Sequence, residues 1–268
     1  MHKLTAGIGA AALALAACGA GDAGALPTEV GPDDVILIVS DEGGFAPVET
    51  LLGRHPRFVL QADGRLYTPG SVPAIYPGPL LTPIFVGTVS DEAFAEILRL
   101  VRAAGLPEIE RVEDTAATSH VADAPTTVIT YFDGTSEHTL SVYALGIASE
   151  ESDTARAASS VVRALDQAAA ELTDAAQYLP SRIEIRSGDR TTMPDAVFRN
   201  PQPWPLALAP DELPETAHGW RCVLVEGSEA TDLLDVFGAA NQATTWEHEG
   251  TEHTLLARGL MPGEPGCA

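Results

Sequence analysis

Two histidines near the end of the chain lie among acidic residues, a combination of side chains that can hold a metal ion. In the segment His248-Glu249-Gly250-Thr251-Glu252-His253 the histidines are five residues apart, whereas the helical zinc motif of metalloproteases needs a spacing of four so that both rings face one ion. Glu249-Gly250 is typical of a tight turn between two strands. We therefore expect exposed hairpin residues here rather than a zinc site, and we interpret His138, in an earlier hairpin, in the same way.

The 38 acidic residues of the chain are the other groups that could do chemistry. With so many carboxylates, closeness alone does not identify a general acid and base. Asp33, Asp34, Asp41 and Glu42 flank one apolar run, but no loop of the sequence has the alternating oxygen ligands and central glycine of an EF-hand calcium site. The chain also lacks the G-x-S-x-G elbow of many hydrolases and the C-x-x-C pair of thiol oxidoreductases. We therefore predict no catalytic residues, no metal and no cofactor.

The charge balance restricts the partners of the chain. The formal net charge is −23, and Lys3 is the only lysine. The absence of other lysines excludes P-loop, Schiff-base and pyridoxal chemistry, and a strongly negative surface repels phosphate groups. Nucleic acid and anionic lipid headgroups are therefore poor partners for the folded part.

Cys18 is placed where a thiol can be acylated. Lys3 and the uncharged run from Leu4 to Ala17 have the layout of a secretory signal with small residues before its cleavage point. The run is shorter than the roughly 20 residues of a membrane-spanning helix. The final Leu15-Ala16-Ala17-Cys18 resembles the lipobox of bacterial lipoproteins. The resemblance implies a signal peptide over residues 1–17 and acyl chains on Cys18 that bind the lipid bilayer, with a plain secreted protein as the alternative.

The other two cysteines, Cys222 and Cys267, form an even pair. In an oxidising compartment a disulfide is the default for such a pair, and neither cysteine has a Cys or His nearby at metal-ligand spacing. We predict that they are bonded. The bond would hold the C-terminal tail to the strand around Cys222 and stabilise the fold by roughly 3 to 4 kcal/mol.

The order of the elements indicates an α+β fold, with antiparallel hairpins that form a sheet packed by about three helices on one face. Hairpin turns are expected at Asp63-Gly64, Asp133-Gly134 and Glu249-Gly250. Helices are expected over residues 90–104, over 149–176 and after Ser228. A flexible tether over residues 18–33 precedes an α+β domain over 34–178. Residues 179–268 form a C-terminal α+β portion, within the same domain or beside it.

Two proline-rich connections interrupt this order. Residues 69–83 hold five prolines around Tyr76, and residues 194–214 hold six. An aromatic side chain held by prolines loses little freedom when it packs on a partner, and Phe45 follows a glycine pair that allows close approach. Phe45 and Tyr76 therefore either form a binding surface or pack over the open side of the sheet.

Several segments together resemble a group of uncharacterised lipoproteins from high-GC Gram-positive bacteria. They are Gly43-Gly44-Phe45, Asp63-Gly64-Arg65, Tyr76-Pro77-Gly78-Pro79-Leu80-Leu81, Ala122-Asp123-Ala124-Pro125-Thr126, Tyr143-Ala144-Leu145 and Arg258-Gly259-Leu260-Met261-Pro262-Gly263-Glu264. The resemblance implies the outer face of the cytoplasmic membrane as the location and brings no activity. We expect a non-enzymatic module that binds an envelope protein or polymer. The alternative is an envelope-polymer hydrolase with an unidentified carboxylate pair.

Overall fold

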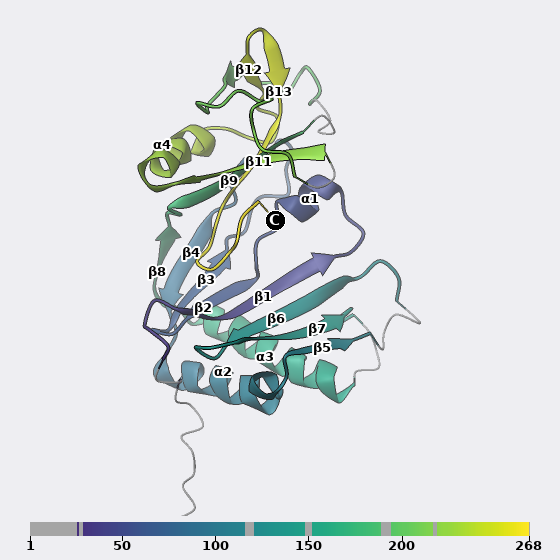
Figure 1. Ribbon diagram of the computed structural model, residues 1–268, viewed down its shortest axis with the longest axis vertical. Coiled ribbons are helices and arrows are strands. Elements are labelled where there is room, and N and C mark those ends of the chain that lie inside the picture. Colours follow the sequence, from purple (N-terminus) through teal and green to yellow (C-terminus); the bar gives the residue numbers. More distant parts are fainter. Residues whose placement is uncertain are drawn as a thin grey trace, which may run out of the picture.

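An eight-stranded sheet forms the centre of the computed structural model, which describes residues 26, 29–115, 121–147, 152–188, 194–216 and 219–267 (Figure 1). In spatial order its strands are β5 (Arg111–Asp114), β7 (Glu137–Tyr143), β6 (Pro125–Phe132), β1 (Val35–Gly43), β2 (Phe58–Gln61), β3 (Arg65–Pro69), β4 (Ile84–Thr88) and β8 (Thr173–Tyr178). Within this sheet, the β5–β7 pair is parallel and the other described pairs are antiparallel. The predicted turns at Asp63-Gly64 and Asp133-Gly134 connect β2 to β3 and β6 to β7. The signal peptide, Cys18 and most of the tether lie outside the described residues.

Helices α2 (Asp91–Ala103) and α3 (Asp153–Ala170) cover one face of this sheet (Figure 1). The hydroxyl groups of Ser90 and Ser152 cap them by accepting hydrogen bonds from backbone N–H groups. The short 3₁₀ helix η1 (Leu106–Glu108) follows α2. Buried apolar side chains of the two helices and of β1, β2, β6 and β7 form the main core between the layers. In the described part of the chain, no helix has the length and apolar composition of a membrane span.

Helix α3 is shorter than the helix predicted over residues 149–176. It ends at Ala170, and residues 173–178 form β8 instead. Their Thr-Asp-Ala-Ala-Gln-Tyr sequence has little intrinsic strand preference. Pairing with the edge of β4 decides the conformation of this segment.

Two smaller sheets follow. Strands β11 (Trp220–Glu226), β9 (Arg182–Gly188) and β14 (Leu255–Gly259) form an antiparallel sheet with β9 in the middle. Helix α4 (Gly227–Gly238) packs on it through Leu233 and Phe237. Strands β10 (Gln202–Pro203), β12 (Trp246–His248) and β13 (Thr251–His253) form the other. The α+β class is confirmed, with α2 and α3 on the large sheet and α4 on a separate one.

The C-terminal tail covers part of the second face of the large sheet. Met261, just after β14, is buried in a cluster with Val59, Tyr67 and Ile84 of β2, β3 and β4. Residues on both sides of position 178 therefore share a buried apolar cluster.

Candidate functional site

A buried carboxylate lies where the tail meets the sheet of β9, β11 and β14. Glu184 of β9 is only 1 % exposed. Its Oε1 accepts hydrogen bonds from Nε of Arg186 at 2.6 Å and Nε of Arg258 at 3.2 Å, and its Oε2 accepts one from the backbone N–H of Cys267 at 2.6 Å. Burial alone would raise the pKa of the Glu184 carboxyl. The hydrogen bonds from the two arginines and the Cys267 amide outweigh that effect and lower the pKa to about 2.

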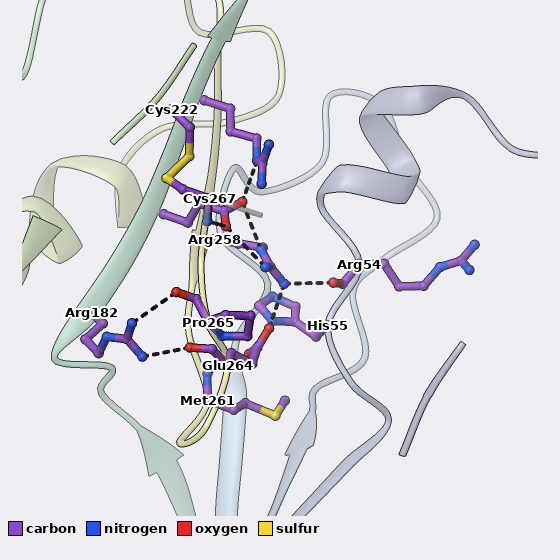
Figure 2. Close-up of polar contacts among 11 residues, drawn as sticks. Arg54, His55, Arg182, Cys222, Arg258, Met261, Glu264, Pro265 and Cys267 are labelled. Carbon is purple, nitrogen blue, oxygen red and sulfur yellow. Dashed lines mark hydrogen bonds and ion pairs between the residues drawn. A yellow bond between two sulfur atoms is a disulfide. The ribbon is translucent and has the colours of Figure 1, made fainter. Parts of the chain in front are cut away.

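Arg258 of β14 connects this carboxylate to two other parts of the chain (Figure 2). Its Nη1 donates to the Glu264 carboxylate at 2.7 Å and to the Arg54 backbone carbonyl at 3.0 Å. Burial by itself lowers the pKa of Arg258, but the contacts with Glu184 and Glu264 raise it overall. One cation therefore joins β9, the tail and the segment that follows α1 (Val48–Leu52).

The predicted disulfide is present beside this network. Cys222 and Cys267 are bonded with their Cα atoms 5.6 Å apart. The two sulfur atoms and a Glu184 oxygen are the one group of possible metal ligands that lie together within the described ranges. Both sulfurs are consumed by the disulfide, and the carboxylate is held by two arginines. The group therefore stabilises the fold and does not suit a metal ion.

His55 lies next to this network but forms no hydrogen bond with it. The residue is 8 % exposed, and its Nδ1 is 4.0 Å from Oε2 of Glu264. Neither ring nitrogen has a hydrogen-bond partner among the described residues. A buried polar group without a partner costs about 1 to 3 kcal/mol, and such groups often mark a functional position.

A cavity of about 510 Å³ opens between α1 and β14, and His55 lines it. Its walls come from α1 and the residues after it, the first proline-rich connection, β9 and β14. They are Glu49, Thr50, Leu52, Gly53, His55, Tyr76, Pro79, Leu80, Thr82, Glu184, Arg186, Pro194, Gln242, Thr254, Leu255, Leu256, Ala257 and Arg258. The volume is in the range of small-ligand pockets. The cavity thus combines apolar and charged side chains in its walls with the His55 imidazole, whose two nitrogens are covered and lack hydrogen-bond partners among the described residues.

The two residues predicted as a binding surface are separated in the structure. Tyr76 lines the cavity, is 56 % exposed and packs its ring edge-to-face on Phe198, with centroids 5.5 Å apart. Phe45 does not line it. Phe45 is 90 % exposed, so it does not pack over the sheet, and its N–H donates to the Asp123 carbonyl.

The histidines considered as metal ligands have other surroundings. His248 and His253 lie on β12 and β13, and both rings contact Trp204. The expectation that His138 is exposed is wrong, because it is buried with Nε2 2.9 Å from the Asp133 carboxylate and Nδ1 2.6 Å from the Ile109 carbonyl. Both partners are acceptors, so the ring donates from both nitrogens and carries a charge.

The acidic residues around β1 do not converge on one ion. Asp33 and Asp34 precede the nine-residue strand, and Asp41 and Glu42 lie at its other end, about 20 Å away at the rise of a strand. Asp33 pairs with Arg65, whereas Asp41 accepts a hydrogen bond from the Thr127 hydroxyl at 2.8 Å.

The chain matches no known protein family, and no match was found among curated proteins or solved structures. The geometry of the cavity and its side chains carries the functional argument that follows. His55 is the residue that sequence patterns do not single out, since its neighbours Arg54 and Pro56 form no motif with it. The residues that surround it come from distant β14 and the tail.

Proposed function

We propose that the chain is a lipid-anchored, extracytoplasmic binding protein, with acyl groups on Cys18 at the outer face of the cytoplasmic membrane. The L-A-A-C segment supports the anchor. The net charge of −23 also supports it, because a negatively charged body gains nothing from anionic headgroups and depends on the lipid. Incorporation of labelled palmitate into the wild type, and its loss in Cys18→Ser, is the expected result. Equal labelling of both forms would contradict it.

The cavity between α1 and β14 is the proposed binding site for an envelope protein or polymer. The observation that carries this proposal is the buried His55 imidazole, which lines the cavity with both nitrogens unpartnered. Because both nitrogens are covered in the structure, a ligand bonds to them only if the ring turns toward the cavity, and that hydrogen bond then removes the cost of the unpaired group. Because that gain is made only in the complex, it contributes to affinity.

A hydrolase mechanism with a carboxylate pair has less support from the same geometry. Glu184 and Glu264 are the two carboxylates that Arg258 brings together. Glu184 has a pKa of about 2, so it stays ionised near neutral pH and cannot donate a proton as a general acid. These carboxylates suit a structural role better than catalysis.

Photo-crosslinking in intact cells tests the site. A benzophenone amino acid replaces Thr50, which lines the cavity, or Val48, which lies on the same helix and does not line it. We expect an adduct with Thr50 and none with Val48, and mass spectrometry of the adduct then identifies the class of ligand. The absence of a Thr50-specific adduct would refute binding in the cavity.

A further inference from the structure

Strand β14 has an open edge along the cavity. It pairs with β9 on one side, and no strand of the described chain pairs with its other side. The N–H of Leu260 donates to the Arg182 carbonyl at 2.9 Å. Because hydrogen-bonded positions alternate in an antiparallel ladder, Arg258 and Leu256 bond to β9, whereas Ala257 and Leu255 direct their N–H and C=O groups away from it.

These outward backbone groups face a space large enough for another chain. Residues Leu255 to Arg258 all line the cavity, and the opposite wall is α1 with Glu49, Thr50 and Leu52. No other described residue forms a hydrogen bond with the backbone of Leu255 or Ala257 outside the β9 ladder. A strand edge of this kind is a template for an added strand.

We propose that the cavity binds an extended, positively charged peptide segment, which pairs with β14 as a fourth strand of that sheet. This inference rests on the proposed binding function and names its ligand class. In strand addition, main-chain hydrogen bonds supply affinity and neighbouring pockets select alternate side chains. Four residues of β14 extend about 13 Å, so the paired part of the ligand is about four residues long.

His55 and the charges of the chain favour this ligand. The His55 ring lines the cavity beside the paired strand, and after a turn of the ring its covered, unpaired nitrogens can bond to a peptide group or a polar side chain of the ligand. The wall residues Arg186 and Arg258 are paired with the Glu184 and Glu264 carboxylates, so the cavity wall itself has no strong excess of positive charge that would repel a cationic segment. The net charge of −23 attracts cationic segments and repels anionic ones.

Hydrogen–deuterium exchange of the full-length protein tests whether the edge is open. We expect the Ala257 amide to exchange at least 10-fold faster than the amides of Leu256 and Arg258, which bond to β9. Equal protection of all three amides would overturn the proposal, because the edge would then already be occupied.

A pool of bead-bound hexapeptides, randomised at every position without proline, tests the ligand class. We expect the wild type to retain peptides enriched in Arg and Lys and to bind them at least 10-fold more tightly than Ala257→Pro, which lacks the outward N–H. Ala257→Ser keeps that N–H and is the matched control. Thermal unfolding confirms that both variants fold. If Ala257→Pro does not fold, the wild type is tested instead with retained peptides that are N-methylated at alternate amides. We expect binding to be lost when one alternate set of amides is methylated and kept when the other set is.

The two proposals fail in different ways. If no peptide is retained but the Thr50 crosslink gives an adduct of another chemistry, such as a saccharide, the peptide inference is overturned and the binding function stands. If neither experiment gives a specific product, both are overturned. Retention that is equal in wild type and Ala257→Pro, or is not biased toward Arg and Lys, also contradicts the inference.

Discussion

Replacement of Glu184 by glutamine should destabilise the protein by about 3 kcal/mol at pH 7. The carboxylate is 1 % exposed and compensates Arg186 and Arg258. Its pKa falls from an ordinary 4.5 to about 2, which at about 1.4 kcal/mol per pH unit corresponds to about 3 kcal/mol. Removing one partner of a buried ion pair typically costs about 3 to 5 kcal/mol, since the remaining charge is left uncompensated.

The pH dependence of this effect has a defined sign. A lowered folded-state pKa means that the contribution of Glu184 is fully present above pH 4.5 and is lost as the pH falls toward 2. The difference in free energy of unfolding between wild type and Glu184→Gln should therefore shrink over this interval. Urea unfolding at pH 7, 4.5 and 2, with the disulfide intact, measures that difference.

Glu226→Gln is the matched control for this measurement. Glu226 lies on the neighbouring strand β11 and pairs with Arg182 at 2.8 Å, but its side chain is 60 % exposed. An exposed pair of this kind is worth less than about 1 kcal/mol. The reasoning is refuted if Glu184→Gln costs no more than Glu226→Gln at pH 7, or if its cost grows as the pH falls.

Three further predictions concern other parts of the chain. Replacing Cys222 and Cys267 together by serine removes a link between residues 45 apart and should lower the free energy of urea unfolding by about 4 kcal/mol; a loss below 1 kcal/mol would contradict this. The hydrogen bond with the Asp133 carboxylate and, to a smaller extent, the one with the Ile109 carbonyl raise the pKa of His138. This contribution to stability is complete below pH 6.5 and lost as the pH rises past the folded pKa. NMR titration should therefore show a lower His138 pKa in Asp133→Asn, and an unchanged pKa would contradict the ion pair. Tyr76→Ala should change stability by less than about 1 kcal/mol, because its ring is half exposed, yet weaken binding of the retained peptides several-fold; unchanged binding would exclude Tyr76 from the site.

Local features of the fold follow from the sequence where short-range chemistry decides them. Asp-Gly pairs impose the tight turns of the β2–β3 and β6–β7 hairpins. Ser90 begins α2 because its hydroxyl satisfies a free N–H at the helix start. The Cys222–Cys267 bond follows from counting cysteines in the predicted compartment.

Features set by distant partners could not be predicted in this way. Strand β8 forms only because β4 offers a free edge. The alternation Ile183-Glu184-Ile185-Arg186 indicates a strand with one apolar and one polar face, and such a polar face is usually exposed to water. Here the tail covers it, which turns Glu184 and Arg186 into buried ions. His55 becomes notable only through this burial.

The same contacts that bury these ions also make the cavity rigid. Arg258 contributes to the cavity wall and at the same time holds the Arg54 carbonyl after α1, Glu184 in β9 and Glu264 in the tail. The wall of α1 and the wall of β14 are therefore held by one side chain whose donors are directed by fixed acceptors. A ligand that enters between preformed walls orders few additional groups, so less of its interaction energy is lost to conformational entropy. On this basis the buried network and the open β14 edge have complementary roles: the network fixes the position of the edge, and the edge supplies the hydrogen bonds.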